Sequence, residues 1–240
     1  MCRRAQDRVR GYFYKLKDEI TTSTLYKTSA NARRLIEETL AIIRILLSSV
    51  DYFSTYFDRS CKRKHASVAT VIIDELDGKT PRKKIKTDQS TMFKNCDLNS
   101  KFCISLCNER GDFICQGLWN EKNCKYCEHK INPYASRENA ILFQIWNLDH
   151  QIEISRSIMP SFLQHIEDIV NKRGRCLVHN KMGKHVSVLK YFIEIFTTDN
   201  LKLVHIVCHE KGSHKLESNG GILCENCDEY KFICSLLKSK

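Results

Sequence analysis

The sequence predicts an α+β fold with short strands and added helices. The first observation is a helical spacing of apolar side chains over residues 5–20 and 30–48. The second is a pair of apolar runs, 138–150 and 200–209, that each end on residues able to carry chemistry. The third is the concentration of cysteine and histidine after residue 103. At 240 residues, 42% of them hydrophobic, the chain can bury one good-sized core.

Two amphipathic helices are expected in the first predicted segment, residues 1–60. Their apolar stripes are interpreted as core, packed on each other or on the rest of the domain. The stripes are Val9, Tyr12, Phe13, Leu16 and Ile20 in the first helix, and Leu35, Ile36, Leu40, Ile43 and Leu47 in the second.

The second segment, residues 61–102, is basic and polar and shows little periodicity. We expect a long insertion without regular structure there. Its "PRKKIK", residues 81–86, is either a nuclear localisation patch or a solvated basic loop.

The third segment, residues 103–240, holds the remaining predicted strands and helices. In chain order they are a strand over 138–150 that ends at Asp149 and His150, a helix over 152–170 interrupted near Pro160, a helix over 186–196, and a β-rich run over 200–209 that ends at Cys208 and His209.

Charge and cysteine content narrow the class of protein. Lys and Arg number 39 against 28 Asp and Glu, a net charge of +11, which indicates a nucleic-acid partner or, more simply, a basic but ordinary surface. The amino terminus has no uninterrupted apolar stretch, so we expect neither a signal peptide nor a membrane span. Thirteen cysteines in a cytosolic or nuclear chain favour reduced thiols and zinc ligands over a disulfide framework.

The two strand ends carry the residue types of a metal-dependent phosphodiesterase. An Asp-His pair, Asp149 and His150, is followed later by Asn200, an apolar strand and His209, which is the order of the ββα-metal (HNH) nuclease motif. A neutral imidazole at His150 suits a general base, because its pKa lies near the working pH. Asp149 and His209 can hold a divalent cation and leave positions open for phosphate and water.

Neighbouring polar residues extend this site. Consecutive strand residues face opposite sides, so Asp149 and His150 share a site only if the strand ends there. Asn200 can then bond backbone groups of the turn, and three further side chains lie close enough in sequence to His209 to reach phosphate oxygens. These are His214, Lys202 and Lys211.

The cysteines allow two arrangements of a zinc site. One set is Cys115, Cys124, His129 and Cys208; the other is two CxxC pairs, Cys124 with Cys127 and Cys224 with Cys227. Both need Cys124, and two separate sites that divide the cysteines differently remain open. On these residues alone, a non-catalytic zinc-stabilised DNA-binding or dimer-partner protein stands beside the nuclease.

With these residues in view, the sequence resembles the caspase-activated DNase family, which carries out apoptotic DNA fragmentation. The matching stretches are "YFDRS" (56–60), "LCNERGDFICQG" (106–117), "HKINPYASRENAILFQIWNLDH" (129–150) and "TTDNLKLVHIVCHEKGSHKL" (197–216). The resemblance implies His150 as general base, Asp149 and His209 as magnesium ligands, His214 as a phosphate contact, and functional roles for Tyr134, Lys202 and Lys211. It also implies structural zinc on Cys115, Cys124, His129 and Cys208, with Cys127 able to replace Cys124.

The resemblance further implies a magnesium-dependent endonuclease that cuts double-stranded DNA in chromatin without sequence preference. The partners would be an inhibitor chaperone, cut by caspases on activation, and a second copy of the chain. The location would be the nucleus, and the cytoplasm before activation. The family's amino-terminal interaction domain and dimerisation segment are not matched, which predicts a fragment or shortened form and leaves both protein partners open. "DELDG", residues 74–78, has the pattern that caspases cut.

Overall fold

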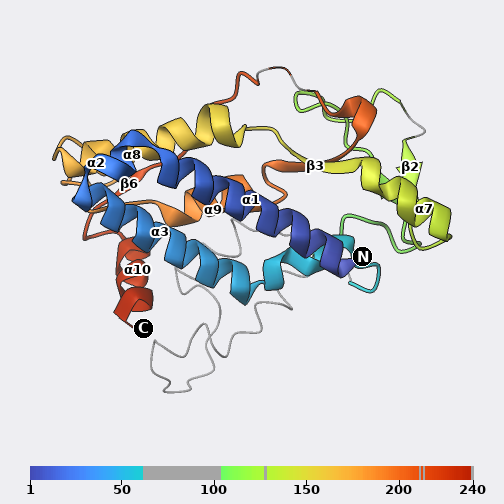
Figure 1. Cartoon of the computed structure of the whole chain (residues 1–240), viewed down its shortest axis with the longest axis horizontal. Coiled ribbons are helices and arrows are strands. Elements are labelled where there is room, and N and C mark those ends of the chain that lie inside the picture. Colours follow the sequence, from blue (N-terminus) through green and yellow to red (C-terminus); the bar gives the residue numbers. More distant parts are fainter. Residues whose placement is uncertain (62–103, 127–128, 211, 213, 239–240) are drawn as a thin grey trace.

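Helices and three short two-stranded sheets build the structure, a computed structural model that describes residues 1–61, 104–126, 129–210, 212 and 214–238 (Figure 1). The helical elements are α1 (Cys2–Thr22), α2 (Thr24–Thr28), α3 (Ala30–Ser49), η1 (Asp51–Phe57), α7 (Arg137–Leu142), η3 (Phe143–Ile145), η4 (Ile154–Ile158), α8 (Met159–Val170), α9 (Val188–Phe196), η5 (Ile206–Cys208) and α10 (Asp228–Lys238). The strands are β1 (Phe113–Ile114), β2 (Lys130–Ile131), β3 (Trp146–His150), β4 (His185–Val186), β5 (Leu201–His205) and β6 (Ile222–Leu223). This confirms the α+β class.

The two predicted amino-terminal helices are α1 and α3. Val9, Phe13, Leu16 and Ile20 form a buried stripe on α1, as their spacing predicts, whereas Tyr12 is only partly buried. Ser29 is the N-cap of α3, and its hydroxyl accepts a hydrogen bond from the Ala32 amide (3.2 Å).

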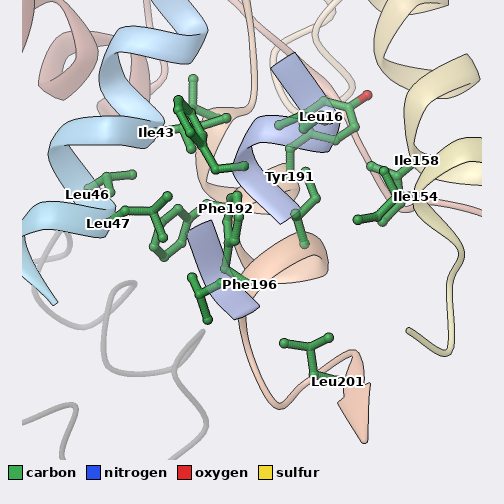
Figure 2. Close-up of a cluster of buried hydrophobic side chains, with 14 of the residues drawn as sticks. Leu16, Ile43, Leu46, Leu47, Ile154, Ile158, Tyr191, Phe192, Phe196 and Leu201 are labelled. Carbon is green, nitrogen blue, oxygen red and sulfur yellow. The ribbon is translucent and has the colours of Figure 1, made fainter. Parts of the chain in front are cut away.

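The main core forms where α9 packs against both α1 and α3. Figure 2 shows Phe192 and Phe196 of α9 meeting Leu46 and Leu47 of α3. The fully buried aromatic rings make α9 the element that the other helices enclose.

The strands β3 and β5 pair antiparallel and place the two predicted strand ends side by side. In their register Asp149 lies opposite Lys202 and His150 opposite Leu201. The three-residue 3-10 turn η5 follows β5 and leads to His209.

The expected strand over residues 138–150 is too long. Only β3, its last five residues, is a strand, and the first part forms α7 and η3. Ser136 caps α7 by accepting a hydrogen bond from the Asn139 amide (3.1 Å), and Glu138 lies in the first turn. These local signals at its start make the first half of the apolar run helical, so strand periodicity applies only to its last five residues.

The predicted interruption of the helix near Pro160 is a change of helix type and not a break, because the backbone stays helical from Ile154 to Val170. A π-helical segment, η4, precedes α8, and Pro160 lies in the first turn of α8, where its missing amide hydrogen costs no helical bond. The helices η4, α8 and α9 all belong to the connection between β3 and β5.

Asn200 closes that connection. Its side-chain Oδ1 accepts from the Ile152 amide (2.7 Å), and its Nδ2 donates to the carbonyls of Ile152 (3.0 Å) and Glu194 (2.6 Å). This buried amide thereby joins the end of β3 to the end of α9, as the sequence predicts.

We expect Asn200→Ala to lower the free energy of unfolding by about 3 kcal/mol, because it leaves buried backbone groups without partners. The measurement is urea denaturation followed by circular dichroism. Asn219→Ala, at an exposed position, is the control and should stay within about 0.5 kcal/mol. Equal stability of the two variants would contradict the role assigned to Asn200.

Two further observations concern the chain as a whole. The predicted insertion at 61–102, with "PRKKIK" and "DELDG", lies almost entirely outside the described residues, so these three interpretations stay predictions. Among the described helices, none is by itself long and apolar enough to cross a membrane, and α3 with η1 meets that test only as a pair bent by 46°.

Candidate active site and metal ligands

A cleft of about 420 Å³ opens where β3 ends. Its walls come from three separate parts of the chain: α1, the β3 end with the η4 segment, and the residue after η5. The ionisable residues that line it are Tyr12, Lys15, Asp149, His150, Glu153, Arg156 and His209. The cleft thus contains the predicted base and both predicted magnesium ligands.

Asp149 and His209 face each other across the cleft. The Asp149 Oδ1 atom lies 3.3 Å from His209 Nε2, and the side chains are 13% and 30% exposed. Burial raises the pKa of Asp149, while the nearby His209 and His214 act in the opposite direction. A carboxylate oxygen and an imidazole nitrogen that converge in this way are a donor pair for a divalent cation.

His150 occupies the buried side of the same strand end. Its Nε2 lies 2.8 Å from the Ile195 carbonyl oxygen, which only accepts, so Nε2 carries the hydrogen and Nδ1 is the unprotonated nitrogen. Burial lowers the pKa of His150 to about 4, well below the near-neutral value expected from the sequence, so the ring is neutral at physiological pH. The Tyr12 ring packs edge-on against it, with ring centres 4.7 Å apart.

The strand end resolves the geometric problem of adjacent residues. His150 lies on the buried face of β3 with Trp146 and Leu148, and Asp149 lies on the opposite face. Both still line the cleft, because β3 stops at His150 and the chain turns there.

His214 lies against the same strand end. Its Nδ1 donates to the Gln151 carbonyl (2.9 Å), and the Trp119 ring stacks on it at 4.5 Å. Its amide donates to Glu153 (3.1 Å). The other ring nitrogen, Nε2, is buried without a hydrogen-bond partner among the residues that the structure describes, which marks a position suited to a polar ligand.

The first predicted zinc set comes together. The ligand atoms of Cys115, Cys124, His129 and Cys208 all lie within 4.8 Å of one another. The Cys124 and Cys208 sulfurs are 3.6 Å apart, and His129 Nδ1 lies 3.5 Å and 3.4 Å from them. Tetrahedral zinc sets sulfurs about 3.8 Å apart and a sulfur–nitrogen pair about 3.5 Å apart. The four residues can therefore hold a metal ion.

Backbone geometry supports this cluster. The amides of Gly117 and His205 each donate to the Cys115 sulfur (3.4 Å). Gly117 has a φ of +78°, and a Cβ there would lie 2.6 Å from the Asn123 carbonyl oxygen. Glycine at this position therefore allows the chain before Cys124 to approach Cys115.

Comparison with known proteins gives the family. A family model described as DNA fragmentation factor 40 kDa matches residues 1–231. The chain belongs to the DNA fragmentation factor 40 kDa family. DNA fragmentation factor subunit beta of Mus musculus is 33% identical over 175 residues, 73% of this chain and 44% of the relative. The Homo sapiens protein of the same name is 39% identical over 132 residues, 55% of this chain and 32% of the relative.

The fold comparison agrees. A crystal structure of caspase-activated DNase matches with a TM-score of 0.62 and 29% identity, covering 94% of this chain and 66% of that chain. The chain therefore spans less than half of each of these two curated relatives and about two thirds of the solved structure.

Within this member of the DNA fragmentation factor 40 kDa family, two residues predicted for the site make other contacts, although Lys202 lies opposite Asp149 in the register of β3 and β5. The Lys202 ammonium donates to the carbonyls of Leu118 (2.8 Å) and Glu121, so it holds the loop that carries Trp119. Tyr134 donates to the Phe57 carbonyl and lies under the Arg59 guanidinium, 5.0 Å from the ring centre. Neither lines the described part of the cleft. Lys211 lies outside the described residues.

The sequence did not predict the two cationic residues Lys15 and Arg156 of the cleft, nor Tyr12 and Glu153 beside them. Lys15 comes from α1, which was interpreted only as a core helix, and Arg156 comes from η4. The exposed face of an amphipathic helix gives no signal for which of its polar residues borders a site formed by a distant strand.

The rival cysteine set is not brought together. Cys224 and Cys227 lie with Cys176 and His179, and Cys124 belongs to the other cluster. Cys127 lies outside the described residues, so its ability to replace Cys124 stays a prediction. Sequence reasoning left Cys176 and His179 out, although their spacing resembles that of the CxxC pairs.

Proposed function

We propose that this chain is a metal-dependent endonuclease that hydrolyses double-stranded DNA without sequence preference, as in apoptotic DNA fragmentation. The observation that carries the proposal is a single cleft holding a facing Asp149–His209 pair and a neutral His150. The names of the relatives, DNA fragmentation factor subunit beta and caspase-activated DNase, support it.

His150 acts as the general base. The Ile195 carbonyl holds the proton on Nε2, so Nδ1 is the atom that accepts a proton from water. Tyr12 fixes the ring from the other side: its hydroxyl donates to the Leu148 carbonyl (2.5 Å), which ties α1 to β3 beside the base. The imidazole is therefore oriented before DNA binds.

Asp149 and His209 would hold magnesium. The fit rests on their facing donor atoms, 3.3 Å apart and both partly open to the cleft. When bound, the ion would neutralise charge on the scissile phosphate and on the leaving oxygen. With a hydrogen on both ring nitrogens, His214 would donate from Nε2 to a phosphate oxygen while Nδ1 keeps its bond to the Gln151 carbonyl.

Zinc is proposed at Cys115, Cys124, His129 and Cys208, where it would have a structural role. The site joins the segment before β3 to η5, and Cys208 directly precedes His209. The position of the magnesium ligand would thus depend on the zinc cluster next to it.

Affinity for DNA would come from phosphate contacts, for which Lys15 and Arg156 at the cleft and the net charge of +11 are suited. A nuclear location, reached from the cytoplasm on activation, follows from that substrate. The relatives are named as a subunit, which supports a protein partner; an inhibitor chaperone and a second copy of the chain are proposed.

The test is cleavage of a supercoiled plasmid by the purified chain. We expect linear and fragmented DNA with magnesium, and no cutting without it. Asp149→Asn should abolish cutting, whereas Asp18→Asn, at an exposed position of α1, should cut normally. DNA that is bound but not cut in magnesium would instead favour a non-catalytic DNA-binding protein, and preferential cutting of RNA would favour a ribonuclease.

A further inference from the structure

A second cluster of metal-binding residue types lies apart from both sites described above. The ligand atoms of Cys176, His179, Cys224 and Cys227 are all within 4.8 Å of one another. Three of the residues are buried and His179 is exposed. No residue is shared with the first cluster, so the two groups use six cysteines and two histidines between them.

The distances fit a tetrahedral ion. The Cys227 sulfur lies 3.5 Å from the Cys176 sulfur and 3.8 Å from the Cys224 sulfur. The His179 Nδ1 lies 3.7 Å, 3.4 Å and 3.5 Å from the sulfurs of Cys176, Cys224 and Cys227. A disulfide would need about 2.05 Å, whereas zinc in this ligand set predicts sulfurs about 3.8 Å apart.

Two backbone turns present the ligands in pairs. In the first turn, Arg175 and Met182 form a β-bridge. The Cys176 amide donates to the Lys181 carbonyl (2.9 Å), and the Asn180 amide donates to the Cys176 carbonyl (2.8 Å). Between the two ligands, Leu177 and Val178 are 88% and 81% exposed. Apolar burial therefore does not stabilise the tip of this turn, and another interaction is needed to hold it.

The second turn leads into the last described helix. The Cys227 amide donates to the Cys224 carbonyl (3.1 Å), and α10 begins at the next residue, Asp228. In α10, all of which the structure describes, Ile233 is buried, and Tyr230, Phe232, Leu236 and Leu237 pack against the core while partly buried. A helix of 11 residues is marginal by itself, so an anchor just ahead of its first turn would add to this packing.

We propose that Cys176, His179, Cys224 and Cys227 bind a second zinc ion, which anchors α10 to the β4–β6 end of the domain. Glu229, in the first turn of α10, connects this helix to the core. Its carboxylate accepts from the Leu189 amide (2.9 Å) and the Ser187 hydroxyl (2.8 Å), which caps the amino-terminal end of α9. The ion therefore stabilises the helix whose other end holds His150.

The test is the zinc content of the purified full chain, measured by mass spectrometry after removal of loosely bound metal. We expect two zinc ions per chain, one in Cys227→Ser and one in Cys208→Ser. Cys234→Ser is the matched control, because Cys234 lies on α10 outside both clusters, and it should keep two. If the wild type holds one zinc ion and Cys227→Ser still holds it, the proposal is overturned. If the wild type holds one zinc ion that is kept in Cys208→Ser and lost in Cys227→Ser, the second site is supported.

Hydrogen exchange supplies a second readout. Loss of the ion in Cys227→Ser should speed exchange at least tenfold in α10 and the first turn of α9, with little change in β1 and β2. Unchanged exchange in α10 would overturn the anchoring role.

If Cys227→Ser does not fold, Cys227→His replaces one sulfur ligand by nitrogen and keeps the site. With cobalt in place of zinc, the thiolate-to-cobalt absorption should fall in proportion to five thiolates instead of six. Absorption equal to that of Cys234→His would overturn the proposal.

Discussion

His150→Asn is expected to lower the rate of plasmid cleavage by a factor of about 10² to 10⁴, the range for loss of a general base. The substitution removes the unprotonated Nδ1, whereas Asp149 and His209, which face each other at 3.3 Å, are left in place. DNA binding, measured by fluorescence anisotropy without magnesium, should therefore stay close to the wild-type value. The cleavage rate is measured in single turnover, so that product release does not hide the change.

The matched control is His165→Asn. Like His150, His165 has a single strong hydrogen bond, 2.6 Å to the Tyr191 hydroxyl, but it is only partly buried and does not line the described cleft. It should cut at the wild-type rate. A His150→Asn variant that folds normally and cuts as fast as this control would place the base on another residue.

Cys208→Ser is expected to release zinc from the first cluster and to lower the free energy of unfolding by more than about 4 kcal/mol, since loss of a metal site is among the largest single-residue effects. For a chain of this size that is a fall in Tm of at least roughly 8 °C. The segment carrying Cys115, Cys124 and His129 would lose its link to η5. His209 would then follow a residue that is no longer held by the metal. Cleavage should fall together with stability.

Cys107→Ser is the control for that change. Cys107 and Cys208 are both 2% exposed, but Cys107 lies outside both clusters and contacts the Ser105 hydroxyl (3.0 Å), which also suits serine. Its cost should be about 1 kcal/mol, and its zinc content should not change. Differential scanning fluorimetry with and without a zinc chelator measures both variants. Equal melting temperatures would show that the first cluster adds little stability.

Local patterns predicted α1, α3, α8 and α9 well, did not predict α2, α7 and α10, and predicted one strand badly. The α1 stripe follows from the spacing of Val9, Phe13, Leu16 and Ile20 alone, because burying one face of a helix needs no knowledge of the partner. The run over 138–150 is apolar enough for either structure, and Ser136 decides for a helix in its first half. Only pairing with β5, distant in the sequence, sets where β3 begins.

The chemistry of the site was also present in the sequence. The sequence shows an Asp-His pair at a strand end, a later histidine and an asparagine between them. These residue types line the cleft and close the connection between β3 and β5 in the structure. The contributions of Lys15 and Arg156 depend on how α1 and η4 pack beside β3, and no local pattern carries that information.

By itself, the sequence determined which donors are available: Asp149, His150 and His209 for the cleft, and cysteines at metal-ligand spacing. Only the tertiary structure decided which cysteines and histidines come together in each metal site. Spacing restricts only ligands a few residues apart, so it does not tell whether Cys124 joins Cys208 or Cys227; packing of the chain does. In the same way, the Ile195 carbonyl selects the proton-accepting nitrogen of His150, and the carbonyls of Leu118 and Glu121 engage the Lys202 ammonium.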